Sequence, residues 1–145
     1  MTVAAIELVA VDDAATREAA RYLIAEYLRW IASAAAASYG LSFDIDAMVA
    51  SDIEDRAKFY PPSGRFYVIR REDANVGVGC LKRITPSVAE IQRMYVQPHA
   101  RGVGAGRLLL CGFRKFWRAD SGNSGHLRRW VWSGRIVKSE VLRSV

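Results

Sequence analysis

Three glycines at every second position, Gly102, Gly104 and Gly106, separate a strand-like segment from an apolar, helix-like one. Glycine is unfavourable at a helix start unless the backbone needs a conformation or a close approach that other residues prevent. A helix N-terminus presents unpaired N–H groups and the positive end of the helix dipole, so this turn is typical of a phosphate site. Arg101 and Arg107 flank the glycines and can add charge-assisted hydrogen bonds. The alternative, a plain tight turn with two solvated arginines, is less favoured.

Two familiar nucleotide motifs do not fit this turn. A P-loop requires Lys followed by Ser or Thr after its last glycine, and no such pair follows here. A dinucleotide fingerprint requires G-x-G-x-x-G, but the third glycine position is occupied by Arg107 or Leu109, depending on the starting glycine. The strands before the turn also follow one another through short turns, without the helical crossover of a βαβ unit.

The order of elements predicts an α+β fold in which helices flank a mixed, largely antiparallel sheet. Apolar periodicity predicts a helix over 14–32, with Asp12 or Asp13 as N-cap, and Ser38 to Gly40 are expected to close it. A second helical region is predicted over 43–60, with Asp44 as its cap. The short turns predict antiparallel pairing. The expected strands are 3–11, 65–71, 76–84 and 88–96, and the last helix is 106–119. At 145 residues, the chain is expected to form a single domain over 1–145.

The net charge of +6 comes entirely from the end of the chain. Residues 1–112 hold 13 basic and 13 acidic residues, whereas residues 113–145 hold eight basic and two acidic residues. Three of the four tryptophans, Trp117, Trp130 and Trp132, also lie in this second segment. The sequence therefore combines an electrically neutral body with an atypical basic tail.

Several classes of function are not expected. Cys80 and Cys111 lie in apolar runs and are predicted to be small buried hydrophobes without a disulfide. His99 and His126 have no partner at metal-ligand spacing, so no metal is expected. The first residues lack a basic leader and the longest apolar stretch is too short to span a bilayer. We therefore expect a cytoplasmic protein without a membrane partner.

The segment "AEIQRMYVQPHARGVGAGRLLL" resembles the central motif of the GNAT superfamily of N-acetyltransferases. In that motif, a strand ends in an apolar-x-Pro segment, and Arg/Gln-x-x-Gly-x-Gly/Ala then leads into a helix. Residues 101–106 match without a gap, Val96-Gln97-Pro98 precedes them, and the upstream order of elements also agrees. The resemblance covers roughly residues 1–112.

The resemblance implies acetyl-CoA as cosubstrate and direct attack by the amine of a small-molecule or amino-acid-like acceptor, with no covalent enzyme intermediate. It implies that the backbone from Gly102 to Arg107 holds the pyrophosphate, with Arg101 assisting, and that the edge of the fourth strand pairs with the pantetheine arm. It also implies that the fourth and fifth strands splay apart to admit the thioester. The implied cofactor-binding residues are Met94, Tyr95, Val96, Arg101, Gly102, Val103, Gly104, Ala105, Gly106 and Arg107.

Glu90 is the candidate general base, because the resemblance allows a carboxylate on the fourth strand and the attacking amine must lose a proton. Strand alternation predicts that Glu90, Gln92, Met94 and Val96 share one face. An equally weighted alternative is that Glu90 forms an ion pair with Arg93 or Lys82. On the second helical region, Asp52, Glu54 and Asp55 suit a cationic acceptor, but a solvated face is the favoured interpretation.

The tail departs from the family. The tyrosine that acts as general acid in family members has no counterpart, because Tyr95 is the last tyrosine. "HLRRWVW" is a candidate fifth strand and "RIVKSEVL" a short helix or strand, so the C-terminal strands are expected to be incomplete. A shifted or prematurely ended reading frame and a native basic tail are the alternatives. An uncovered sheet edge would favour aggregation or a homodimer.

Two further functions compete with catalysis. One is a pseudoenzyme that binds CoA without turnover. The other is a basic nucleic-acid-binding protein whose arginines and tryptophans grip phosphates and stack on bases; no known nucleic-acid-binding motif supports it, and it is not favoured. Its residues would be Arg114, Lys115, Trp117, Arg118, Arg128, Arg129, Trp130, Trp132 and Arg135.

Overall fold

The computed structural model describes residues 5–120 and 129–132 and contains the elements in the expected order. They are β1 (Ile6–Ala10), α1 (Ala14–Tyr39), α2 (Ile45–Glu54), α3 (Arg56–Phe59), β2 (Gly64–Arg71), β3 (Ala74–Thr85), β4 (Val88–Val96), η1 (Pro98–Ala100), α4 (Ala105–Asp120) and β5 (Arg129–Trp132). The expected second helical region is divided in two at Asp55, whose carboxylate accepts a hydrogen bond from the Ala57 N–H at 3.0 Å and caps α3.

The long helix α1 begins and ends where its local sequence predicts. Asp13 is the N-cap and forms a capping box with Thr16, whose N–H donates to the Asp13 carboxylate at 2.8 Å. Gly40 ends the helix in the left-handed conformation, with φ of 64°. The predicted apolar face is confirmed by five buried residues, Ala20, Leu23, Ile24, Tyr27 and Leu28.

The five described strands form one sheet in the order β1-β2-β3-β4-β5. Strands β2, β3 and β4 form the predicted antiparallel meander. Strand β1 also pairs antiparallel with β2, whereas β5 runs parallel to β4. The pairing of Val88 with Arg129 through Ile91 with Trp132 confirms a fifth strand in the candidate segment. The segment "RIVKSEVL" and any further strands lie outside the described residues.

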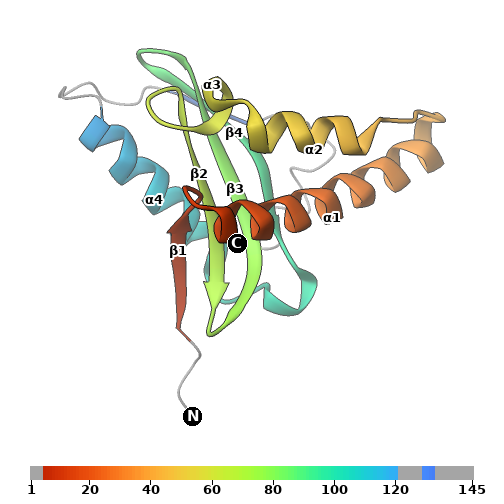
Figure 1. Ribbon diagram of the computed structural model, residues 1–145, viewed down its shortest axis with the longest axis horizontal. Coiled ribbons are helices and arrows are strands. Elements are labelled where there is room, and N and C mark those ends of the chain that lie inside the picture. The colour runs from red at the N-terminus through yellow and green to blue at the C-terminus, as the bar shows by residue number, and fades with distance from the viewer. Residues whose placement is uncertain (1–4, 121–128, 133–145) are drawn as a thin grey trace.

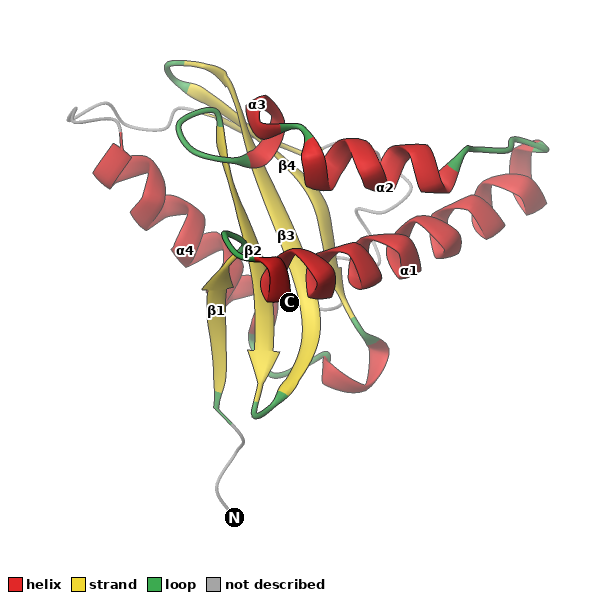
Figure 2. Cartoon of the chain, viewed as in Figure 1, coloured by secondary structure: helices red, strands yellow, loops and turns green. Residues whose placement is uncertain are grey.

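Helices cover both faces of the sheet, with α1, α2 and α3 on one side and α4 on the other (Figures 1 and 2). The close approach of α4 depends on Gly79, where an added Cβ would lie 2.8 Å from a methyl group of Leu109. Phe113 and Trp117 of α4 are buried, with Trp117 only 1% exposed. The Trp117 ring is therefore unavailable for stacking on a base, contrary to the nucleic-acid alternative. For Trp130 and Trp132 the structure describes the backbone only.

The two cysteines differ in environment. Cys80 is buried, as predicted, but Cys111 is exposed, so the prediction is wrong for Cys111. The apolar run around Cys111 is part of α4, and this residue lies on the helix face that points away from the sheet. Among the described helices, none is both long and apolar enough to cross a membrane. Within the same residues, no group of three or more His, Cys, Asp or Glu side chains is arranged to hold a metal.

Candidate active site

A bulge interrupts β4 at Arg93. Tyr95 lies opposite Val78 and Gln92 lies opposite Cys80, so two residues of β4 face one residue of β3. Arg93 has a φ of 53°, in the left-handed region that non-glycine residues adopt rarely. The bulge therefore inserts one residue into the strand and changes which side chains point to each face.

The predicted alternation along β4 is wrong beyond Gln92 for this reason. Paired residues share a face of the sheet, and the partners of Gln92 and Tyr95 on β3 are two positions apart, so those partners also share a face. Tyr95, instead of Met94, therefore continues the face that carries Glu90 and Gln92. Its ring centroid lies 5.6 Å from that of Tyr27 on α1, which identifies this face as the one under α1 and α2.

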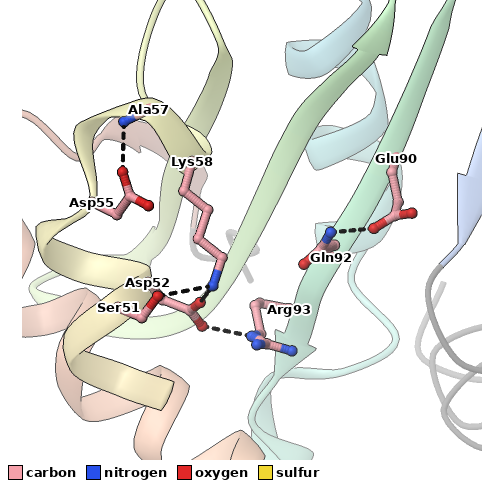
Figure 3. A network of polar contacts seen from close by, with 8 residues as sticks. All are labelled: Ser51, Asp52, Asp55, Ala57, Lys58, Glu90, Gln92 and Arg93. Atoms are coloured by element: carbon pink, nitrogen blue, oxygen red, sulfur yellow. Dashed lines mark hydrogen bonds and ion pairs between the residues drawn. The ribbon is translucent and has the colours of Figure 1, made fainter. Parts of the chain in front are cut away.

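A buried ion network joins α2, α3 and β4. The side chain of Asp52 is 0% exposed, and its carboxylate lies 2.6 Å from Arg93 Nε and 2.5 Å from Lys58 Nζ (Figure 3). The side chains of Lys58 and Arg93 are themselves 21% and 17% exposed. The predicted solvated position is therefore wrong for Asp52, because one carboxylate is buried between two cations from different elements.

This network was not predicted from the sequence, although the spacing of residues on α2 contained a signal for it. Ile45, Val49 and Ile53 mark the apolar face of α2, and Asp52 falls on the same face at helical spacing. By contrast, the side chain of Glu54 is 70% exposed, as a solvated face requires. A charged residue on an apolar stripe is expected to have a buried partner.

Glu90 lies half-buried on β4, opposite Lys82 in the register. The Gln92 side-chain amide donates a hydrogen bond to the Glu90 carboxylate (Figure 3). In the described part of the chain, Glu90 makes no ion pair with Lys82 or Arg93, and Arg93 is paired with Asp52 instead. The carboxylate is thus held by a neutral amide, and no cation of the described residues neutralises it.

The glycine turn combines a left-handed backbone with open space. Gly102 and Gly104 have φ values of 82° and 88°, and a Cβ added at either would meet no atom within 4 Å. Glycine is therefore required at both positions by the backbone conformation and not by crowding. The turn leaves room for a ligand to approach the backbone closely.

Helix α4 begins directly after this turn. The Leu108 N–H donates to the Gly104 carbonyl at 3.0 Å, which makes this the first hydrogen bond of the helix. The preceding N–H groups, those of Ala105, Gly106 and Arg107, belong to the first turn and have no acceptor within the helix. Arg107 is exposed there. These donors and the positive end of the helix dipole can bind an anion.

Arg101 contacts the end of β4. Its Nε donates to the Val96 carbonyl at 2.8 Å, and its guanidinium carbon lies 6.0 Å from the centre of the Tyr95 ring. The Gln97 N–H donates to the Val76 carbonyl of β3, so the neighbouring Val96 directs its own N–H and C=O away from β3. Arg101 therefore links the end of β4 at Val96 to the start of the glycine turn.

A second polar cluster joins α1 to the end of β4. Gln97 Nε2 donates to the Glu26 carboxylate at 3.0 Å. Burial raises the pKa of Tyr95, and the nearby Glu26 carboxylate adds to this rise. Burial also raises the pKa of Tyr27 to about 12. Both tyrosines are therefore neutral at physiological pH, and Glu26 was not among the residues expected from the sequence.

The described pairing of β4 with β5 covers Val88 to Ile91. The expected divergence of the two strands beyond this point lies outside the described residues. Within them, β4 carries an amide-held carboxylate at Glu90 and a charged bulge at Arg93, and it ends at Val96, shortly before the glycine turn. This order suits a ligand with a phosphate group at one end and a group that loses a proton at the other.

Residues 62–137 match the family model of the acetyltransferase (GNAT) domain. No curated protein sequence matches the chain. Solved structures with a similar fold include an acetyltransferase from Streptococcus agalactiae, with a TM-score of 0.64 and 20% identity over 94% of this chain and 78% of that one.

Two further solved structures have a TM-score of 0.59. One is a predicted acetyltransferase with acetyl-CoA from Clostridium acetobutylicum, which is 12% identical over 94% of this chain and 88% of that one. The other, from Salmonella typhimurium, modifies the N-terminal serine of a 50S ribosomal subunit protein and is 18% identical over 95% of this chain and 77% of that one. At these identities, the likeness concerns the fold.

Proposed function

This chain belongs to the GNAT family of acetyltransferases, and from that membership we propose that it transfers an acetyl group from acetyl-CoA to the amine of a small-molecule or amino-acid-like acceptor. The observation that carries the proposal is the turn at Gly102 and Gly104. Both glycines have positive φ and open surroundings, and the first turn of α4 follows at once. These features match what a pyrophosphate requires: close backbone approach, unpaired N–H groups and a positive dipole end.

The proposed cosubstrate site continues from the turn onto β4. The backbone from Gly102 to Arg107 would hold the pyrophosphate, with Arg101 placed beside it at the end of the strand. The segment Met94 to Val96 would receive the pantetheine arm as an added strand, and the outward-directed polar groups of Val96 support this. Acetyl-CoA, when bound, supplies an acetyl group that is activated as a thioester.

Glu90 is the proposed general base. Most amines are protonated at pH 7, and only the neutral amine is a nucleophile, so a base that accepts the ammonium proton accelerates transfer. The Glu90 carboxylate is half-buried and has no cation paired to it in the described chain, and Gln92 orients it by a hydrogen bond. It can therefore accept this proton, either directly or through a water molecule.

The test is a thermal-shift titration with acetyl-CoA on the wild type and on Gly104→Glu. A ligand at about 100 times its Kd stabilises the folded state by about 2.7 kcal/mol, which raises Tm by roughly 5–15 °C. We expect this rise in the wild type. We expect no rise in Gly104→Glu, which adds a carboxylate at the anion site.

Gly40→Glu is the matched control. Gly40 also has positive φ and no atom within 4 Å of an added Cβ, so the control carries the same backbone strain and the same added charge at the end of α1. It should melt lower than the wild type and keep the full acetyl-CoA shift. A wild type without a shift, or equal loss of the shift in both variants, would contradict the proposed site.

Turnover is measured next, with a panel of amines. Acetyl-CoA binding without any turnover would favour the pseudoenzyme alternative over the enzyme. A cytoplasmic location and a homodimer remain predictions from the sequence.

A further inference from the structure

The ion network around Asp52 carries an excess of positive charge. One carboxylate, fully buried, is shared by Lys58 and Arg93, and both cations are mostly buried as well. Burying a charge is unfavourable unless a partner compensates it. Two cations against one anion leave one positive charge without a counterion in this network. An anionic group of a ligand would supply the missing counterion.

Among the described residues, Arg93 is the cation of this network that keeps more unused donors. It binds Asp52 through Nε only, and its two terminal nitrogens make no hydrogen bond or ion pair within the described residues. Lys58, by contrast, contacts both Asp52 and the Ser51 hydroxyl. Figure 3 shows part of the Arg93 guanidinium directed away from Asp52. Because a guanidinium has five donors in a planar fork, the remaining edge suits a carboxylate in a two-bond contact.

The position of Arg93 relates it to the proposed chemistry. Arg93 follows Glu90 by three residues on the same strand, and its contact with α2 places it on the face that carries Glu90, Gln92 and Tyr95. Along about 10 Å of β4, this face therefore presents a negative group and then a positive one. A molecule with an ammonium at one end and a carboxylate at the other has the complementary polarity.

We propose that the acceptor is an amine that also carries a carboxylate, a molecule of the amino-acid class, and that Arg93 determines this specificity by binding the carboxylate. The inference rests on the proposed function, which assigns Glu90 to the amine. Asp52 acts as a positioning residue, because its contact with Nε leaves the outer edge of the guanidinium toward the ligand.

The experiment compares amino acids with their own carboxamides, which keep the amine and lose the charge. Steady-state acetylation is measured at saturating acetyl-CoA for α-, β- and γ-amino acids and the matching amides. We expect kcat/KM to favour the carboxylate form of the preferred acceptor by roughly 10- to 100-fold, the range of a charge-assisted contact. Arg93→Gln should reduce this ratio to about one.

Lys58→Gln is the matched control, because it also removes one of the two cations that share Asp52 and leaves a single buried ion pair. It should retain the preference for the carboxylate form. A second readout needs no turnover: the N-acetylated amino acid, added without acetyl-CoA, should raise Tm in the wild type and Lys58→Gln but not in Arg93→Gln. Its N-acetylated amide should raise Tm in none of them.

The outcomes separate the two proposals. Equal or faster acetylation of the amides would overturn the role of Arg93 and leave the acetyltransferase function intact. The role of Arg93 would also be overturned if the preference for the carboxylate form persisted in Arg93→Gln, or if Lys58→Gln lost this preference equally. No turnover with any amine would contradict the proposed function, and the inference would fail with it.

Discussion

At the scale of single residues, β4 places two side chains of opposite charge on one face. Glu90 is held by the amide of Gln92, and Arg93 is held by the carboxylate of Asp52. The Gln92 amide occupies one acceptor position of the Glu90 carboxylate, and Asp52 occupies one donor of the Arg93 guanidinium, so other positions of both groups stay available. Both charged groups therefore remain able to contact a ligand, one as an acceptor and the other as a donor.

Replacing Glu90 by Gln tests its role as base. At pH 7 the rate of acetyl transfer should fall by about 10²- to 10⁴-fold, because proton removal from the ammonium loses its catalyst. The rate of the variant should recover as pH rises, since the fraction of neutral amine grows. The measurement is kcat against pH, together with the acetyl-CoA thermal shift, which should not change. Glu7→Gln, on the exposed face of β1, is the control and should have the rate of the wild type. A wild-type rate in Glu90→Gln would show that Glu90 is not the base.

At the scale of secondary-structure elements, Asp52 is a buried polar connection between the helical layer and β4. It links α2 to Lys58 of α3 and to Arg93 at the bulge. Since the bulge sets which side chains of β4 face α1 and α2, this connection stabilises the same geometry that forms the proposed site. The contacts of α1 with β3 and β4 also hold the helical layer against this part of the sheet.

Removing the carboxylate should therefore be more harmful than removing either cation. Asp52→Asn leaves two buried cations without a counterion and is expected to lower the free energy of unfolding by about 3–5 kcal/mol. Arg93→Gln should be less harmful, because the Asp52–Lys58 pair remains. Urea denaturation gives both values. Glu54→Gln, whose exposed side chain lies 3.9 Å from Arg21, should stay within about 0.5 kcal/mol of the wild type. An Asp52→Asn variant as stable as Glu54→Gln would refute the network's importance.

At the scale of the whole molecule, the core contains groups whose charged forms are disfavoured. Burial raises the pKa of Tyr27 to about 12, and it also raises the pKa values of Tyr60, Tyr95 and Cys80. An unfolded tyrosine titrates near pH 10. Between pH 10 and 12 the unfolded chain has lost protons that the folded chain keeps, so the contribution of Tyr27 to stability is complete below pH 10 and is lost as pH approaches 12.

The free energy of unfolding should therefore fall steeply above about pH 10. Tyr27→Phe should make this fall shallower by up to about 1.4 kcal/mol per pH unit, the effect of one proton. Urea denaturation at intervals from pH 9 to 11.5 measures the slope. Tyr22→Phe, which changes a ring that is 62% exposed, is the control and should leave the slope unchanged. Identical slopes in wild type and Tyr27→Phe would count against the buried tyrosine as a cause.

The sequence by itself determined the features that depend on neighbouring residues. The cap at Asp44, the end of α1 at Gly40 and the glycine turn before α4 all follow from local backbone preferences, and the same preferences restricted the cap of α1 to Asp12 or Asp13. The meander follows from the alternation of its strands and their short turns. Because the GNAT motif is one continuous segment, the family could also be identified without a structure.

Only the tertiary structure decided which side chains meet across elements. The bulge at Arg93 depends on how β4 pairs with β3, so strand alternation alone predicted the wrong face for Met94 and Tyr95. The burial of Asp52 depends on α2 packing over β4, and the exposure of Cys111 depends on which face of α4 meets the sheet. Local sequence encodes backbone conformation, whereas burial and pairing arise between segments that are distant along the chain. The charged pair at the centre of the proposed specificity, Asp52 and Arg93, could therefore be found only once those segments were placed together.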